Sequence, residues 1–105
     1  MPKDCIYISA KIRLKTTAEG GRHNGIITGY RPNHVFEYSK NGKIHAFIGE
    51  IQFEEGKTIQ LGVEESVRIC FMKIDQVKEY LTVGRHWFLH EGKRLIGEGT
   101  IISIE

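Results

Sequence analysis

The sequence predicts an all-β protein in which short antiparallel strands form a barrel or a sandwich. Apolar and polar residues alternate with a period of two in several runs, which is the spacing of a half-buried strand. These runs follow one another closely and are separated by turn residues, and the 105-residue chain contains 12 glycines and only 2 prolines. Almost no segment has the period of a helix. This combination is typical of antiparallel all-β folds.

The first strand is expected over residues 6–14, where the alternation is unbroken. The side chains that should face the core there are Ile6, Ile8, Ala10, Ile12 and Leu14. Two further strands are expected over residues 35–39 and 44–53. They flank Asn41-Gly42, and an Asn-Gly pair is the strongest short signal for a hairpin.

The following segments are shorter and less regular. Residues 58–61 predict a short strand, and residues 66–74 are apolar enough for a strand buried on both faces or carrying a bulge. Residues 75–83 suggest a helical turn, although nine residues are marginal for a helix.

A closing hairpin is expected from residues 85–90 and 94–104. Gly97 and Gly99 interrupt its second strand, and glycine within a strand usually marks a bend or a close backbone approach. Closed barrels need such bends. No repeat or linker divides the chain, so a single domain over residues 1–105 is expected.

The composition is that of an ordinary globular protein, with 40% hydrophobic and 27% charged residues. The first residues contain no apolar run typical of a signal peptide, and no stretch reaches the roughly 18 apolar residues of a membrane span. A cytoplasmic protein is therefore expected. Cys5 and Cys70 are expected to be reduced, buried thiols, with a disulfide as the alternative.

The net charge is only +2, but its distribution is uneven. Residues 1–34 hold six Lys or Arg and two Asp or Glu, for a net charge of +4, whereas residues 35–105 hold nine and eleven, for a net charge of −2. A basic first third is compatible with a phosphate-facing surface. Scattered solubilising charge explains it about as well.

No sequence motif indicates catalysis. The chain lacks a P-loop, a GxGxxG motif, a nucleophile elbow and the CxxC or HExxH spacing of zinc sites. His86 and His90 have a helical zinc spacing, but on a strand they would lie about 13 Å apart. We therefore expect neither an enzyme, nor a metal site, nor a cofactor.

Two separated motif blocks resemble the third domain of elongation factor Tu. The first is GGRH at residues 20–23 with GYRP at 29–32, and the second is the segment 83–100, where an acidic-Gly turn leads into a Gly-x-Gly strand. The resemblance implies a six-stranded antiparallel Greek-key barrel that spans nearly the whole chain. It also implies a freestanding binding module without the nucleotide-binding domain of the full factor.

In that family the domain helps to hold the T-stem backbone of aminoacyl-tRNA. The resemblance accordingly implies RNA contacts at Arg22, Asn33, Glu91, Gly92 and Lys93. Asn33 stands where the family usually has glutamine, and Lys93 stands where a second glycine is usual. The residues expected as possible loop or partner contacts are His23, Tyr30, Arg31 and His34.

Three hypotheses remain open from the sequence. The chain is an RNA-binding module for a tRNA stem or ribosomal RNA. Alternatively, it is a protein-binding mimic, decoy or immunity protein that engages elongation-factor partners or a toxin. In the third hypothesis it shares only the fold and has an unrelated function. The sequence does not address the oligomeric state.

Overall fold

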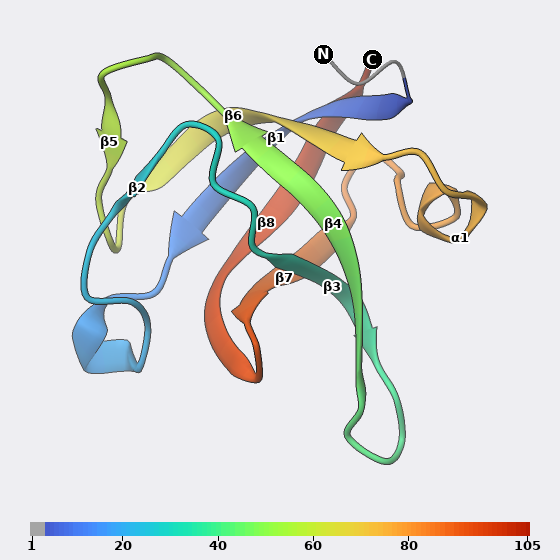
Figure 1. Ribbon diagram of the computed structural model, residues 1–105, viewed down its shortest axis with the longest axis horizontal. Helices are drawn as coiled ribbons and strands as arrows, with labels where there is room; N and C mark the ends of the chain where they lie inside the picture. The colour runs from blue at the N-terminus through green and yellow to red at the C-terminus, as the bar shows by residue number, and fades with distance from the viewer. Residues whose placement is uncertain (1–3) are drawn as a thin grey trace.

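The computed structural model describes residues 4–105, and its six long strands close into a barrel (Figure 1). The strands are β1 (Cys5–Leu14), β3 (Asn33–Tyr38), β4 (Ile44–Gln52), β6 (Glu64–Met72), β7 (His86–Glu91) and β8 (Arg94–Ile104). Their order around the barrel is β1-β6-β4-β3-β7-β8, and all the pairings are antiparallel. The prediction of an all-β, six-stranded antiparallel barrel is confirmed. The connections from β1 to β3 and from β6 to β7 join strands that are not neighbours in the barrel.

A two-stranded ribbon lies beside the barrel (Figure 1). Its strands are β2 (Ile26–Ile27) and β5 (Thr58–Ile59). Ile26 and Ile59 are buried and belong to the main hydrophobic core, so the ribbon covers part of that core. Of these two strands only β5 was expected, within the predicted strand of residues 58–61.

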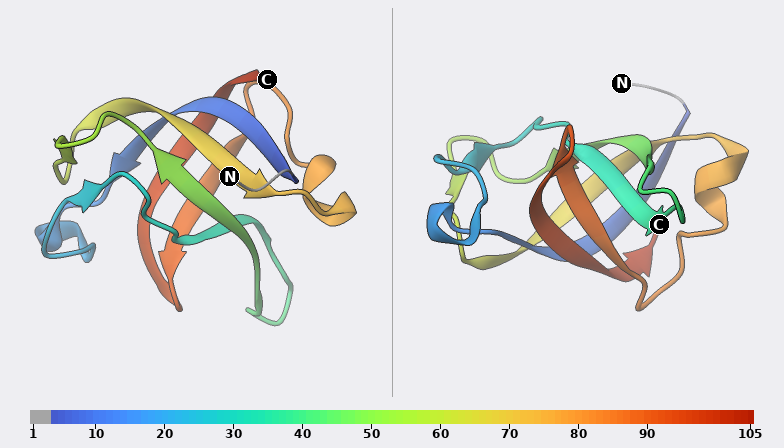
Figure 2. Two further views of the ribbon diagram at one scale, coloured as in Figure 1. Left: turned by 45° about the horizontal axis from the view of Figure 1, so that its top comes forward. Right: turned by 90° about the horizontal axis from the view of Figure 1, so that it is seen from below.

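The helical turn expected within residues 75–83 is present as α1 (Asp75–Lys78). It lies on the opposite side of the barrel from the ribbon (Figures 1 and 2). Val77 in α1 and Leu81 just after it are buried in the core, and this packing stabilises a helix that would be too short on its own. Within residues 4–105, no helix has the length and hydrophobicity needed to cross a membrane.

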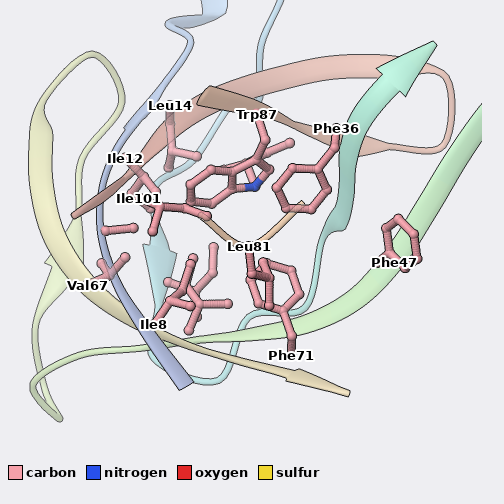
Figure 3. Packing of buried hydrophobic residues seen from close by; sticks show 14 of the residues in the cluster. Ile8, Ile12, Leu14, Phe36, Phe47, Val67, Phe71, Leu81, Trp87 and Ile101 are labelled. Atoms are coloured by element: carbon pink, nitrogen blue, oxygen red, sulfur yellow. The ribbon is translucent and has the colours of Figure 1, made fainter. Parts of the chain in front are cut away.

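Trp87 is fully buried in the barrel interior (Figure 3). Its ring stacks on Phe36 at a centroid distance of 5.8 Å and meets Phe71 edge-on at 6.5 Å. Its indole Nε1 donates a hydrogen bond to Nδ1 of His34, 3.1 Å away, so this buried donor is satisfied.

His34 occupies the same interior and is 0% exposed. Since Nδ1 accepts from Trp87, the proton lies on Nε2, which donates to the carbonyl oxygen of Gly49 at 2.9 Å. Burial lowers the pKa of His34 to about 4, although the Gly49 carbonyl opposes the shift. The side chain is therefore neutral at pH 7.

The two glycines expected to bend the last strand both lie at close contacts of β8. A Cβ added at Gly99 would lie 2.8 Å from Cη2 of Trp87. One added at Gly97 would lie 2.8 Å from the carbonyl oxygen of Arg13 in β1. Both positions leave room only for hydrogen. Gly97 lies at a close approach to the backbone of β1, as one of the expected roles had it, whereas Gly99 lies against side chains.

The expectation of reduced cysteines is wrong in this structure. Cys5 in β1 and Cys70 in β6 form a disulfide, with their Cα atoms 5.4 Å apart. The register places Tyr7 opposite Cys70 and Cys5 opposite Met72, so the two cysteines are diagonal neighbours on adjacent strands. Their separation of 65 residues conceals this proximity in the sequence.

Candidate functional site

Two segments that are far apart in sequence meet at one edge of the barrel. The first is the loop of residues 20–32 together with the start of β3 that follows it directly, and the second is the turn between β7 and β8 (Figure 2). We call this surface the basic edge, and it comprises Arg22, Tyr30, Asn33, Glu91, Gly92, Lys93 and Arg94. It contains all five residues for which the sequence predicts RNA contacts.

Arg22, Tyr30 and Glu91 form a connected cluster at the centre of the basic edge. Arg22 Nη1 and the Tyr30 hydroxyl both donate to Oε2 of Glu91, and the guanidinium also lies 4.8 Å from the centroid of the Tyr30 ring. Burial and the Glu91 carboxylate raise the pKa of Tyr30, so its hydroxyl remains a donor. Burial opposes the charge of Arg22, but Tyr30 and Glu91 outweigh it and raise its pKa.

Arg22 therefore differs from the expected free phosphate ligand, because most of its hydrogen-bonding capacity is used inside the protein. Nε donates to the backbone oxygen of Asn24 at 3.1 Å, and Nη1 donates to Glu91 and Tyr30. Nη2 makes no hydrogen bond with any residue of the described range 4–105. One face of the guanidinium remains available to a ligand.

Local backbone structure fixes the loop that carries Arg22. The 3-10 turn η1 (Thr17–Glu19) begins with a capping box in which Thr16 and Glu19 satisfy each other's backbone N–H groups. The Thr17 hydroxyl then donates to the backbone oxygen of Arg22 at 2.8 Å. At the far end of the loop, the Tyr30 carbonyl accepts from Ile51 N at 2.9 Å, which anchors the loop to β4.

The remaining members of the basic edge are solvent-exposed. Asn33 begins β3 and pairs with His90 of β7, which places it beside the turn. Gly92 has a φ of 57°, a left-handed conformation that glycine adopts without strain, and it lies at the tip of the turn. Lys93 and Arg94 follow it, and within residues 4–105 neither forms an ion pair.

The residues expected as possible loop or partner contacts divide into three groups. Tyr30 lies in the central cluster and His23 is exposed on the loop. Arg31 points away from this cluster and forms an ion pair with Glu50 at 3.0 Å. His34 is wrong as a partner contact, because it is enclosed in the core between Trp87 and Gly49.

Aromatic side chains outside the main core form a second feature that the sequence reading missed. We call it the aromatic face, and it comprises Tyr38 of β3 with His86, Phe88 and His90 of β7. The Tyr38 ring lies 5.6 Å from Phe88 and 5.5 Å from His90, and Phe88 lies 5.3 Å from His86. The i, i+2, i+4 spacing of the three β7 residues was the available signal for this shared face.

His90 carries an unmet hydrogen bond in the aromatic face. Its Nε2 interacts with the Tyr38 hydroxyl at 2.5 Å. Its Nδ1 is buried and is the only buried side-chain nitrogen or oxygen without a hydrogen-bond partner in the described chain. Burial lowers the pKa of His90, while the nearby carbonyls of Lys93 and Gly92 oppose this shift.

An apolar groove lies along β4 and β6, beside the disulfide. Its volume is about 820 Å³, and its lining includes Ile48, Met72 and Ile74. These three side chains are 56%, 50% and 38% exposed, which is unusual for large apolar residues so close together. The Arg31–Glu50 ion pair and the Cys5–Cys70 bridge also line the groove.

Within residues 4–105, no group of three or more His, Cys, Asp or Glu side chains could hold a metal ion. The basic edge therefore offers hydrogen-bond donors and cations to a ligand. Its one carboxylate, Glu91, is paired with Arg22. No known protein-family model matches the sequence.

Proposed function

We propose that this protein is a non-catalytic RNA-binding module, related to the third domain of elongation factor Tu, that contacts the phosphate backbone of an RNA stem through the basic edge. The convergence of Arg22, Asn33 and residues 91–93 carries the proposal. These positions come from two segments that are far apart in sequence, residues 22–33 and 91–93, and they lie at one edge of the barrel.

The charges of the basic edge favour a polyanion. Three cations and one carboxylate give a local charge of +2, and Glu91 is already paired with Arg22. Lys93 and Arg94 directly follow Gly92 in the turn, and this glycine lets a phosphate approach the backbone closely. Contacts of this kind position a protein on RNA without reading its sequence.

The test is a salt titration of binding to a blunt RNA hairpin. Replacing both Lys93 and Arg94 by alanine should weaken binding and reduce the slope of log K against log salt by about 2. The matched control replaces Lys11 and Lys78, two exposed lysines on β1 and α1, and removes the same charge elsewhere. Equal effects of the two pairs, or no binding by the unaltered protein, would overturn the proposal.

The apolar groove favours a second candidate function, a protein-binding mimic, decoy or immunity protein. Ile48, Met72 and Ile74 expose apolar surface that the core does not use. Capture of partners from a cell extract, with and without ribonuclease, separates the two functions. A partner that survives ribonuclease and is lost from the Met72→Asp variant would support this candidate.

A further inference from the structure

The side chains of the aromatic face are not part of the main hydrophobic core of the barrel. None of its four residues belongs to the main hydrophobic cluster, which is built from Trp87, Phe36, Phe71 and the aliphatic residues around them. Tyr38 is nevertheless held in place, by the rings of Phe88 and His90 and by its hydroxyl contact with His90. The rings of the aromatic face are therefore held in place on the strand surface, outside the main core.

Tyr38 offers a large ring surface to solvent. Its exposed fraction is 46%. Phe88, whose ring contacts that of Tyr38, is half-buried, and His86 is exposed. Ring faces held on a strand surface are suited to stacking on unpaired bases, because every base has a π face.

Cations lie at both ends of the aromatic face. Lys93 and Arg94 follow β7, and Lys40 and Lys43 lie in the hairpin that follows Tyr38. Both turns project from the same side of the barrel, with β3 running between them (Figures 1 and 2). None of these four cations has an ion-pair partner within residues 4–105, so all four are available to phosphates.

The acidic residues beside the aromatic face are already engaged. Glu98 lies beside His86, with Oε1 and Nε2 3.2 Å apart, and Glu37 accepts from the Tyr80 hydroxyl at 3.2 Å. Because like charges repel, phosphates are favoured at the two cationic turns rather than beside these carboxylates.

We infer that the aromatic face is a stacking platform for unpaired nucleotides that adjoin the stem bound at the basic edge. This inference rests on the proposed function and specifies its substrate class, a junction between a stem and a single strand. Tyr38 stacks on a base, and the cations at either end contact the flanking phosphates.

The experiment compares two RNA hairpins with the same stem, one blunt and one carrying a four-nucleotide single-stranded extension at its 3′ end. Fluorescence anisotropy at fixed salt gives the affinity of each RNA. The extension should tighten binding to the unaltered protein by about tenfold, the scale of one base stack. Tyr38→Leu should abolish this gain, whereas Tyr38→Phe, which keeps the ring, should retain it.

Phe88→Leu provides a second variant with the same expected loss, and circular dichroism confirms that each variant is folded. Binding of the blunt hairpin should not change in any of them. If the extension gives no gain, or if Tyr38→Leu keeps it, the inference is overturned while the proposed function stands. If Tyr38→Phe loses the gain, a hydrogen bond of the Tyr38 hydroxyl causes it instead of ring stacking, and the stacking inference is overturned. If neither RNA binds, the proposed function fails and the inference fails with it.

Discussion

Two side chains show how individual residues in this protein depend on partners far away in sequence. His34 is a polar residue in the core, and it is tolerated there because Trp87 and Gly49 satisfy both ring nitrogens. Arg22 is a cation on the surface, yet Glu91 and Tyr30 hold it in one orientation. In each case the environment fixes the charge state of the side chain.

Burial of His34 should make stability depend on pH below neutrality. The unfolded chain binds a proton at a pKa of about 6.5, while the folded chain resists protonation down to about 4. The stabilisation is therefore complete above pH 6.5 and is lost as the pH falls toward 4, a difference of about 3 kcal/mol in the free energy of unfolding. Urea unfolding at a series of pH values measures it.

His90, whose pKa is also lowered by burial, contributes with the same sign. The control for His34 is therefore His34→Gln, which keeps a donor and an acceptor but does not titrate. The variant should have a shallower dependence on pH than the unaltered protein. Identical slopes would show that His34 is not the group responsible.

Arg22 and Lys93 should respond differently to truncation although both are cations of the basic edge. Arg22→Ala removes a half-buried ion pair and leaves Glu91 with only Tyr30, so we expect the free energy of unfolding to fall by about 1 kcal/mol. Lys93→Ala removes no ion pair with any residue of the range 4–105 and should change the free energy of unfolding by less than about 0.5 kcal/mol. Chemical denaturation of both variants checks this contrast, and equal losses would contradict it.

At the scale of elements, two glycines mark the positions where β8 lies closest to its neighbours. β8 contacts β1 at Gly97 and lies against the Trp87 ring of β7 at Gly99. The register between β7 and β8 also shifts between Leu89 and His90, next to the turn of the basic edge. The shape of this hairpin therefore links the packing of the core to the position of Lys93.

Gly99→Ala should destabilise the barrel by about 1–3 kcal/mol, the usual cost of overpacking. The added Cβ would lie 2.8 Å from Trp87 and 3.0 Å from Cγ2 of Ile12, and both neighbours are fully buried. Thermal unfolding measures the loss, with the exposed Glu98→Ala on the same strand as the control. An unchanged midpoint for Gly99→Ala would show that the core yields without cost.

At the scale of the whole molecule, the sequence predicts the elements better than their meeting points. Alternation places β1 correctly, because period and burial coincide there, and turn residues place β4 and the final hairpin. No local pattern reveals that Cys5 meets Cys70 or that Arg22 meets Glu91. Each pair is brought together by barrel closure across more than 60 residues. Six of the seven residues of the basic edge are among the candidate residues of the sequence analysis, which missed Arg94 and the pairing of Arg22 with Glu91.

The disulfide should stabilise the whole barrel, because it restricts the unfolded chain. A loop closed over a separation of 65 residues corresponds to about 4 kcal/mol in the chain-entropy treatment. Reduction should lower the free energy of unfolding by up to this amount. The double variant Cys5→Ala/Cys70→Ala should be equally destabilised and insensitive to reductant. A reduced protein as stable as the oxidised one would contradict the prediction.

β1 lies between β6 and β8, and this position has a consequence for biosynthesis. β1 is translated before the other strands of this barrel, and both of its neighbours are translated much later. On the ribosome, β1 has no neighbouring strand to pair with until residues 64–72 have emerged. The barrel stays open until residues 94–104 follow. The alternating apolar face of β1 is exposed throughout that interval. The nascent barrel is therefore most vulnerable to aggregation, and most in need of chaperones, before β8 is released.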